Sequence, residues 1–156
     1  MPMTKYENLL NEAHKQGAQV IEIDLGTDTP CGKCINNIII LNSRMNIKNK
    51  YCILAEELGH YRLNYGDITN QCKIENKKQE IIARRYGYDK NIGLIGLIEA
   101  FEHGCSGKFE IAEYLGITEE YLEEAIDYYK NKYGAMYEID NYLIYFIPNL
   151  FIGKSF

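Results

Sequence analysis

Several features are missing from this 156-residue chain, and each absence excludes a class of protein. No apolar run approaches the roughly 20 residues that a membrane-spanning helix needs. No signal peptide is recognisable, because residues 1–6 lead directly into a polar segment. Positive charge is not in excess either, since the net charge is −5. We therefore expect a cytoplasmic protein that binds neither membranes nor nucleic acid in a sequence-independent way.

Cysteine is scarce and odd in number, with five in the chain. Reduced thiols are the default in the cytoplasm. Cys31 and Cys34 form a C-x-x-C pair, but a structural zinc site needs two more ligands with similar pairing, and the other cysteines are scattered. A thioredoxin-like site needs a helix that opens at its first Cys, whereas an Ile-rich run follows here. We interpret the pair as part of a turn between strands, with redox or metal function as the weaker alternative.

Residue periodicity predicts an α+β fold. The composition is that of an ordinary globular domain, with 46% hydrophobic and 25% charged residues. Helical spacing and capping signals predict helices over residues 4–16, 46–63, 75–88, 92–101, 109–115 and 118–133. Alternating or β-branched runs predict strands over residues 20–25 and 35–42, with a loop over 26–33, a polar connection over 65–74, and a weakly specified hairpin over 136–147.

These elements imply a small antiparallel or mixed sheet, an active-site helix, a helix-turn-helix-like C-terminal part and a short terminal hairpin. We expect a first domain over residues 1–106 and a helical part over residues 107–156, packed together as one unit. The helix-turn-helix-like segment suggests a DNA-binding regulator as one hypothesis. Residues 108–133, however, contain three Lys against seven acidic residues. Because a recognition helix must approach phosphates, this charge argues against direct DNA binding.

The helix predicted over residues 46–63 carries the most informative run, Ala-Glu-Glu-Leu-Gly-His-Tyr at residues 55–61. It matches the H-E-x-x-H metallopeptidase motif, with Glu56 in place of the first His. In the intact motif, two His four residues apart on one helix face bind zinc, and the Glu activates a water molecule. Here Glu57 and His60 keep the spacing of that Glu and the second His. Glu57 and His60 also match the E-x-x-H motif of di-iron bundles, but no second copy occurs.

Two further residues strengthen the metal-site interpretation. Gly59 lies inside the predicted helix, where a Gly lowers helix stability by about 1 kcal/mol relative to Ala. We therefore expect another backbone to approach closely there. Glu80 lies on the following predicted helix and adds a further acidic residue to this interpretation. The alternative for Glu80 is a solvated position beside Lys77, Lys78 and Arg84.

The run from the Ile-rich strand through Glu-Glu-Leu-Gly-His to Lys-Lys-Gln-Glu-Ile-Ile-Ala-Arg at residues 77–84 resembles the ImmA/IrrE family of metallo-endopeptidases. The likeness covers roughly residues 4–133 and is greatest to the phage and mobile-element branch. The resemblance implies a zincin-like active-site helix, with His60 as second zinc ligand, Glu57 as catalytic base and Glu80 as third ligand. Glu56 occupies the first ligand's position and departs from the family's pattern.

The same resemblance implies action on a repressor-type DNA-binding protein, which would switch a phage or mobile element on. Cleavage of the repressor is one hypothesis. A non-catalytic antirepressor or adaptor that binds the repressor with the same fold is the other.

The substituted ligand set has chemical consequences. Glu56, His60 and Glu80 would give one imidazole and two carboxylates, so a bound divalent metal would be a weaker Lewis acid than in a His₂Glu site. The family implies Zn²⁺, whereas the additional oxygen ligand shifts preference towards Mn²⁺ or Fe²⁺. Without metal, we expect the carboxylates to repel one another and to raise one another's pKa.

Overall fold

The computed structural model describes residues 2–63 and 76–155, with side chains at 2–63 and 78–155. The chain forms two compact units, Met1–Lys90 and Asn91–Phe156. The domain boundary expected between residues 106 and 107 falls inside the second unit. The polar connection expected over residues 65–74 lies outside the described residues.

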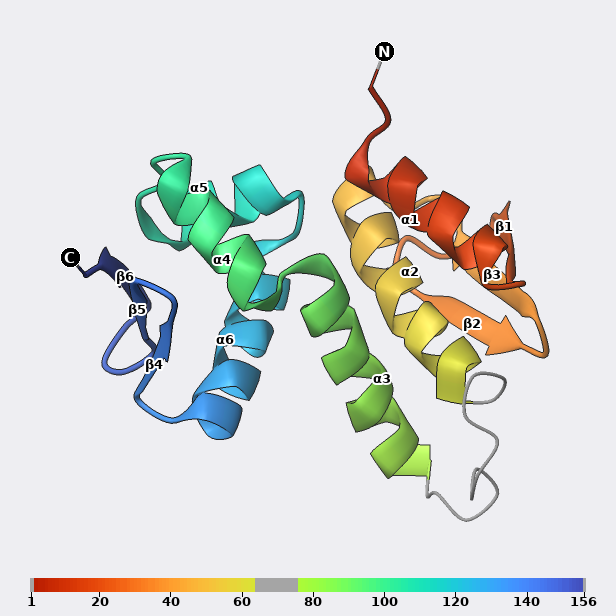
Figure 1. Ribbon diagram of the computed structural model, residues 1–156. Helices are drawn as coiled ribbons and strands as arrows, with labels where there is room; N and C mark the ends of the chain where they lie inside the picture. Colours follow the sequence, from red (N-terminus) through yellow and green to blue (C-terminus); the bar gives the residue numbers. More distant parts are fainter. Residues whose placement is uncertain (1, 64–75, 156) are drawn as a thin grey trace. The chain divides into compact units, whose positions relative to one another are not determined.

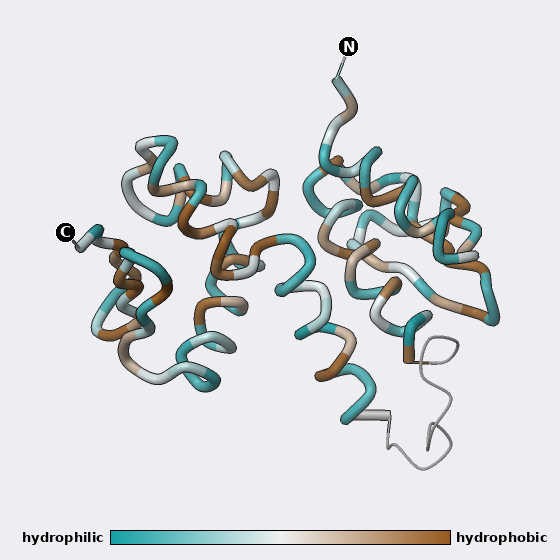
Figure 2. The backbone as a smooth tube through the Cα atoms, in the orientation of Figure 1, coloured by the Kyte–Doolittle hydropathy of each residue, from teal (hydrophilic) through white to brown (hydrophobic). Residues whose placement is uncertain are grey.

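Hydrophobic and hydrophilic residues are interleaved along the backbone of both units (Figure 2). Within residues 2–63 and 76–155, no helix is long and apolar enough to cross a membrane. This agrees with the sequence, where no apolar run reaches the length of a span.

The first unit is built on a three-stranded mixed sheet (Figure 1). β1 (Gln19–Ile23) runs parallel to β3 (Ile38–Asn42), and β2 (Gly32–Ile35) pairs antiparallel with β3, so β2 forms one edge. α1 (Lys5–Lys15) packs on β1, and α2 (Ile47–Tyr61) packs on β2, β3 and α1. Six apolar side chains of α1, β3 and α2 are fully buried: Ala13, Ile39, Leu41, Leu54, Ala55 and Leu58.

The strand expected over residues 35–42 is confirmed for residues 38–42, which form β3, but it begins too early: residue 35 ends β2, and a turn joins the two strands as a hairpin. Ile35 pairs with Ile38, so the turn consists of two residues, Asn36 and Asn37. Asn36 has a φ of 53°, a left-handed conformation that Asn tolerates better than most residues. Isoleucines flank the two Asn residues, so the sequence run resembles one continuous strand.

The C-x-x-C pair is correspondingly not in a turn between strands. Cys31 immediately precedes β2, and Cys34 lies within it. Neither forms a disulfide.

The first two helices begin at the caps that their sequences provide. The Thr4 hydroxyl accepts a hydrogen bond from the Glu7 N–H at 3.1 Å, and the Glu7 carboxylate accepts one from the Thr4 N–H at 3.0 Å. The Asn46 side chain accepts a hydrogen bond from the Asn49 N–H at 2.9 Å, which fixes the start of α2.

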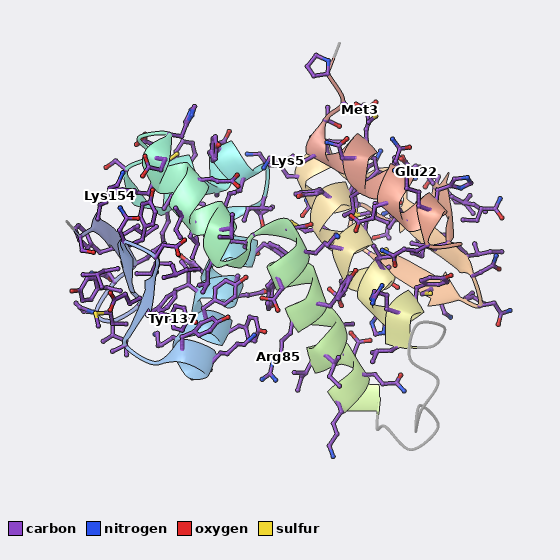
Figure 3. All side chains as sticks on the ribbon, in the orientation of Figure 1. Met3, Lys5, Glu22, Arg85, Tyr137 and Lys154 are labelled. Carbon is purple, nitrogen blue, oxygen red and sulfur yellow. The ribbon has the colours of Figure 1, made fainter. Side chains whose placement is uncertain are left out.

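Two polar residues tie the sheet to its surroundings. Glu22 on β1 (labelled in Figure 3) accepts hydrogen bonds from the Tyr6 hydroxyl at 2.7 Å and from Lys50 Nζ at 2.6 Å. Asn42 is fully buried at the end of β3, and its amide nitrogen donates to the carbonyls of Thr27 at 2.8 Å and Thr29 at 3.1 Å. Asn42 therefore holds the loop that leads into the edge strand β2.

The second unit consists of three helices followed by an antiparallel meander. The elements are α4 (Gly93–Glu102), α5 (Gly107–Leu115), α6 (Glu119–Tyr133), β4 (Met136–Ile139), β5 (Tyr142–Tyr145) and β6 (Phe151–Lys154). The predicted hairpin is present as β4 and β5, joined at Asp140 with a φ of 53°. A further strand that was not predicted, β6, pairs with β5 and extends the hairpin to three strands.

The helix-turn-helix-like pair forms as predicted. Gly116 ends α5 in a left-handed conformation, with a φ of 73°, and the Thr118 hydroxyl caps α6 by accepting from the Tyr121 N–H. The acidic side chains at the start of α6 are all exposed: Glu119, Glu120, Glu123, Glu124 and Asp127.

Candidate metal centre

α2 places three of the predicted site residues on adjoining positions of its surface. Glu56 and His60 are four residues apart, so they lie one above the other on the same helix face. Their side chains are 18% and 15% exposed. Glu57 lies beside them and is only 8% exposed, which is an unusual degree of burial for a carboxylate.

α3 (Asn76–Asn91) brings the fourth predicted residue to this face. Its backbone meets α2 at Gly59, where a Cβ atom would lie 2.7 Å from the Ala83 carbonyl oxygen and 2.9 Å from its Cα. A side chain at residue 59 would therefore force the helices apart. The expected close backbone approach at Gly59 is confirmed. Glu80 lies one turn before Ala83, so this contact positions Glu80 next to His60.

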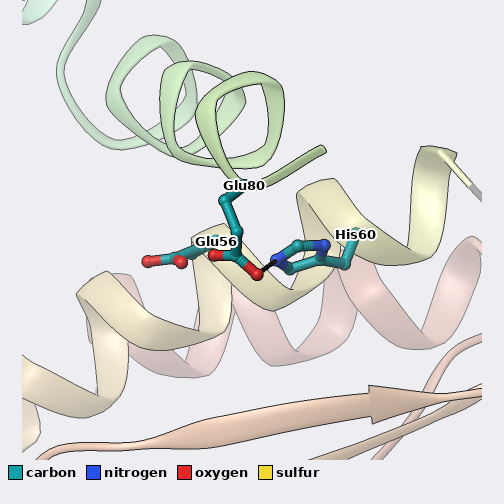
Figure 4. Close-up of side chains that lie close together, drawn as sticks. All are labelled: Glu56, His60 and Glu80. Atoms are coloured by element: carbon teal, nitrogen blue, oxygen red, sulfur yellow. Dashed lines mark ion pairs between the residues drawn. The ribbon is translucent and has the colours of Figure 1, made fainter. Parts of the chain in front are cut away.

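The imidazole and two carboxylates converge in space (Figure 4). His60 Nε2 lies 3.2 Å from Glu80 Oε1. One ligand atom from each of Glu56, His60 and Glu80 lies within 4.8 Å of the other two. Two ligands of one tetrahedral zinc ion are about 3.4 Å apart, so small side-chain adjustments let the three atoms share one cation. Across the part of the chain that the structure describes, no other group of three His, Cys, Asp or Glu residues meets this criterion.

Burial and mutual repulsion alter the acidity of the carboxyls. Burial raises the pKa of Glu57 to about 8, and the charges of Glu56 and Glu80 add to the effect. Burial also raises the pKa of Glu56 to about 6, although the Arg84 guanidinium opposes this rise. The expected carboxylate strain is therefore present, and burial contributes more to it than charge repulsion.

Arg84 is a member of the site that sequence reasoning treated only as a neighbour of Glu80. Its Nε lies 3.6 Å from Glu56 Oε1. Arg84 follows Glu80 by four residues, so both project from one face of α3. That spacing was the signal that could have identified Arg84.

An open cavity of about 270 Å³ adjoins these residues. Its lining comes from β2 (Gly32, Lys33, Cys34), α2 (Glu57, His60) and α3 (Gln79, Glu80). Gly32 permits the close packing of β2 on α2, because a Cβ there would lie 2.7 Å from Ile53 Cγ2 and 3.2 Å from Glu57 Cγ. Burial, with a smaller contribution from the Glu57 charge, raises the pKa of the Cys34 thiol to about 11. Cys34 is therefore a neutral thiol near pH 7, which disfavours a redox role.

The mixed sheet, the helix that carries Glu-Glu-x-x-His and the third carboxylate on the next helix define a metallopeptidase-like domain. The family model for the IrrE N-terminal-like domain (Peptidase_M78) matches residues 13–127, and the chain belongs to this family. Membership indicates a divalent metal as the cofactor. No curated protein and no solved structure gives a significant match.

Proposed function

We propose that the chain is a metal-dependent endopeptidase that cleaves a repressor-type DNA-binding protein of a phage or mobile element in the cytoplasm. Glu56, His60 and Glu80 hold one divalent metal, with Zn²⁺ the first candidate and Mn²⁺ or Fe²⁺ the others. Glu57 is the general base. The observation that carries the proposal is the convergence of three ligand atoms within 4.8 Å beside a buried carboxyl and an open cavity.

The residues divide the work of hydrolysis. A bound divalent metal would polarise the scissile carbonyl and make a water molecule more acidic. Glu57 lies on the cavity and is placed to take the proton from that water and pass it to the leaving amine. At pH 7 a carboxyl with a pKa of about 8 holds its own proton, so the pKa of Glu57 must fall before it can act. A divalent cation held by Glu56, His60 and Glu80 would lower the pKa of Glu57.

The cavity suits an extended peptide. β2 pairs with β3 on one side, and its other side is the edge of the sheet. Three consecutive β2 residues line the cavity, so a peptide segment can approach Glu57 along this strand. A protein substrate is favoured for this reason, and the repressor is the substrate that the family resemblance suggests.

A non-catalytic antirepressor is the second candidate function, and one specific observation favours it. Arg84 already supplies a positive charge to Glu56, and Glu57 is protonated at pH 7 in the absence of metal. A stable metal-free form of the site is therefore chemically reasonable. Such a protein would bind the repressor and block it without cleaving it.

Comparison of wild type with Glu57→Gln in the host strain separates the two functions. Gln keeps the size of Glu but cannot accept the proton. Mass spectrometry of new protein N-termini should reveal a cut in a DNA-binding protein in the wild-type strain and none in the variant. Induction of the element in both strains without any cut would support the antirepressor. The same cut in both strains would contradict Glu57 as base.

A further inference from the structure

We infer that Arg84 is the counter-ion of Glu56, and that it restores the charge balance which the Glu at this position removes. The inference rests on the proposed metal site for its consequence, although the ion pair itself can be tested without metal. Arg84 is a positioning residue here, since it acts on the site through Glu56.

The position of Arg84 follows from the helix crossing. Ala83 is locked against Gly59, so the next residue on α3 lies beside the α2 surface that carries Glu56. Arg84 Nε lies 3.6 Å from Glu56 Oε1, while 56% of the Arg84 side chain stays exposed to solvent. Its guanidinium thus approaches Glu56 from the solvent side. Glu80 lies one turn earlier on the same helix, α3.

The site needs such a cation. Glu56, Glu57 and Glu80 place three carboxyls around His60, and two of the three are largely buried. Glu80 is paired with His60 at 3.2 Å and also shares a hydrogen bond with the Glu56 carboxyl, so the cation beside Glu56 is Arg84. Arginine suits this role because it stays charged at every relevant pH and can contact one carboxylate oxygen while the other remains available.

The net charge supports the assignment. A divalent metal with two neutral His and one Glu leaves a charge of about +1, as in ordinary His₂Glu sites. Two Glu and one His reduce this charge to zero. Adding Arg84 returns it to +1. The substitution at residue 56 is therefore balanced within the chain, and the metal keeps an environment close to that of the intact motif.

This balance has a measurable cost in metal affinity. The positive charge of Arg84 repels a bound metal cation and competes with it for the Glu56 carboxylate. The Arg84→Ala variant should therefore bind Zn²⁺ more tightly, by roughly tenfold at low ionic strength. Arg84→Lys, which retains the charge, should stay near wild type. In a Glu56→His background the arginine has no carboxylate to hold at residue 56, and removing it should change the affinity by less than about twofold.

The first test measures Zn²⁺ affinity by competition with a chromophoric chelator at pH 8, where protons compete little. Wild type, Arg84→Ala, Arg84→Lys, Glu56→His and the Glu56→His/Arg84→Ala double variant are compared. Arg85→Ala is the matched control, since Arg85 carries the same charge one position further along α3 (Figure 3). The inference would be overturned if Arg84→Ala raised the Zn²⁺ affinity equally in both backgrounds, or if Arg85→Ala raised it as much. Arg84 would then act only through the general electrostatic field.

The second test needs no metal. In excess EDTA, Arg84→Ala should lower the melting temperature by about 2 °C in the Glu56 background and leave it unchanged in Glu56→Gln. Equal shifts in both backgrounds would show that the pair has no coupling, which refutes the inference. Absence of zinc binding in all variants would instead reject the proposed metal site, and the melting cycle alone would then decide the role of Arg84.

Discussion

Replacing Glu57 with Gln should stabilise the metal-free protein at neutral and alkaline pH, although the same change should abolish hydrolysis. The reason is the environment of Glu57, which is 8% exposed and lies beside Glu56 and Glu80. Its pKa is raised from 4.5 to about 8 in the folded protein. Between these two values the native state holds a proton that the unfolded chain has lost. Stability therefore falls as pH rises from about 4.5 to 8, and levels off above 8.

The size of this penalty follows from the pKa. Each pH unit above 4.5 lowers the free energy of unfolding by about 1.4 kcal/mol until the pH reaches the folded-state pKa of Glu57, about 8. The loss is therefore roughly 3 kcal/mol at pH 7 and roughly 5 kcal/mol above pH 8. Gln carries no charge and has nearly the same volume, so it avoids this penalty. Its amide must still find hydrogen-bond partners, which removes about 1–2 kcal/mol of the gain. A net stabilisation of roughly 3–4 kcal/mol at pH 8.5 should remain.

The assay is urea unfolding in excess EDTA at pH 5, 7 and 8.5 for wild type and Glu57→Gln. The difference in the free energy of unfolding should be small at pH 5 and should grow with pH. Glu119→Gln on α6 is the control for loss of one exposed carboxylate, and it should alter stability by less than about 0.5 kcal/mol. A difference for Glu57→Gln that stays constant with pH, or that turns against Gln as the pH rises, would refute the burial argument for this carboxyl.

Three further predictions concern packing and partners. Gly59→Ala should destabilise the fold by more than about 2 kcal/mol and weaken metal binding, because its Cβ would lie 2.7 Å from a backbone oxygen. Gly96→Ala should be nearly neutral in thermal melts, because its Cβ would meet only side-chain methyls of Leu115 at 3.5 Å and Ile92 at 3.8 Å. Asn42→Ala should cost about 2–3 kcal/mol in urea unfolding, since it removes the two hydrogen bonds that hold the Thr27 and Thr29 carbonyls of the loop. Residues 108–133 should not bind duplex DNA, and salt-dependent, tight binding in an electrophoretic shift assay would contradict this.

The sequence predicted the local parts of the site well because helical periodicity is a local property. The spacing of Glu56 and His60 requires only that α2 be a helix. The Gly inside that helix predicted a close backbone contact without naming Ala83 as the partner. The packing of α3 on α2, which places Glu80 near His60, could be expected only from the family resemblance.

Features that depend on long-range contacts were harder to predict. The β2–β3 hairpin was missed because its two-residue Asn turn lies within an apolar run that resembles one strand. β6 was missed because its pairing with β5 is set by the fold of the second unit. The pairing of Arg84 with Glu56 joins α3 to α2, so it could not be predicted from the residue spacing along one helix. That spacing relates Arg84 only to Glu80.

The most direct test of the account is metal binding by protein purified without chelator, measured by elemental analysis and by thermal melts with Zn²⁺ and Mn²⁺ against EDTA. We expect one metal per chain and a stabilisation of about 2.7 kcal/mol at a hundredfold excess of metal over Kd. Both should be lost in Glu80→Ala and kept in Gln79→Ala, a neighbouring cavity residue outside the three-ligand cluster. Wild type without metal or thermal shift, or a shift that Glu80→Ala leaves intact, would contradict the proposed site.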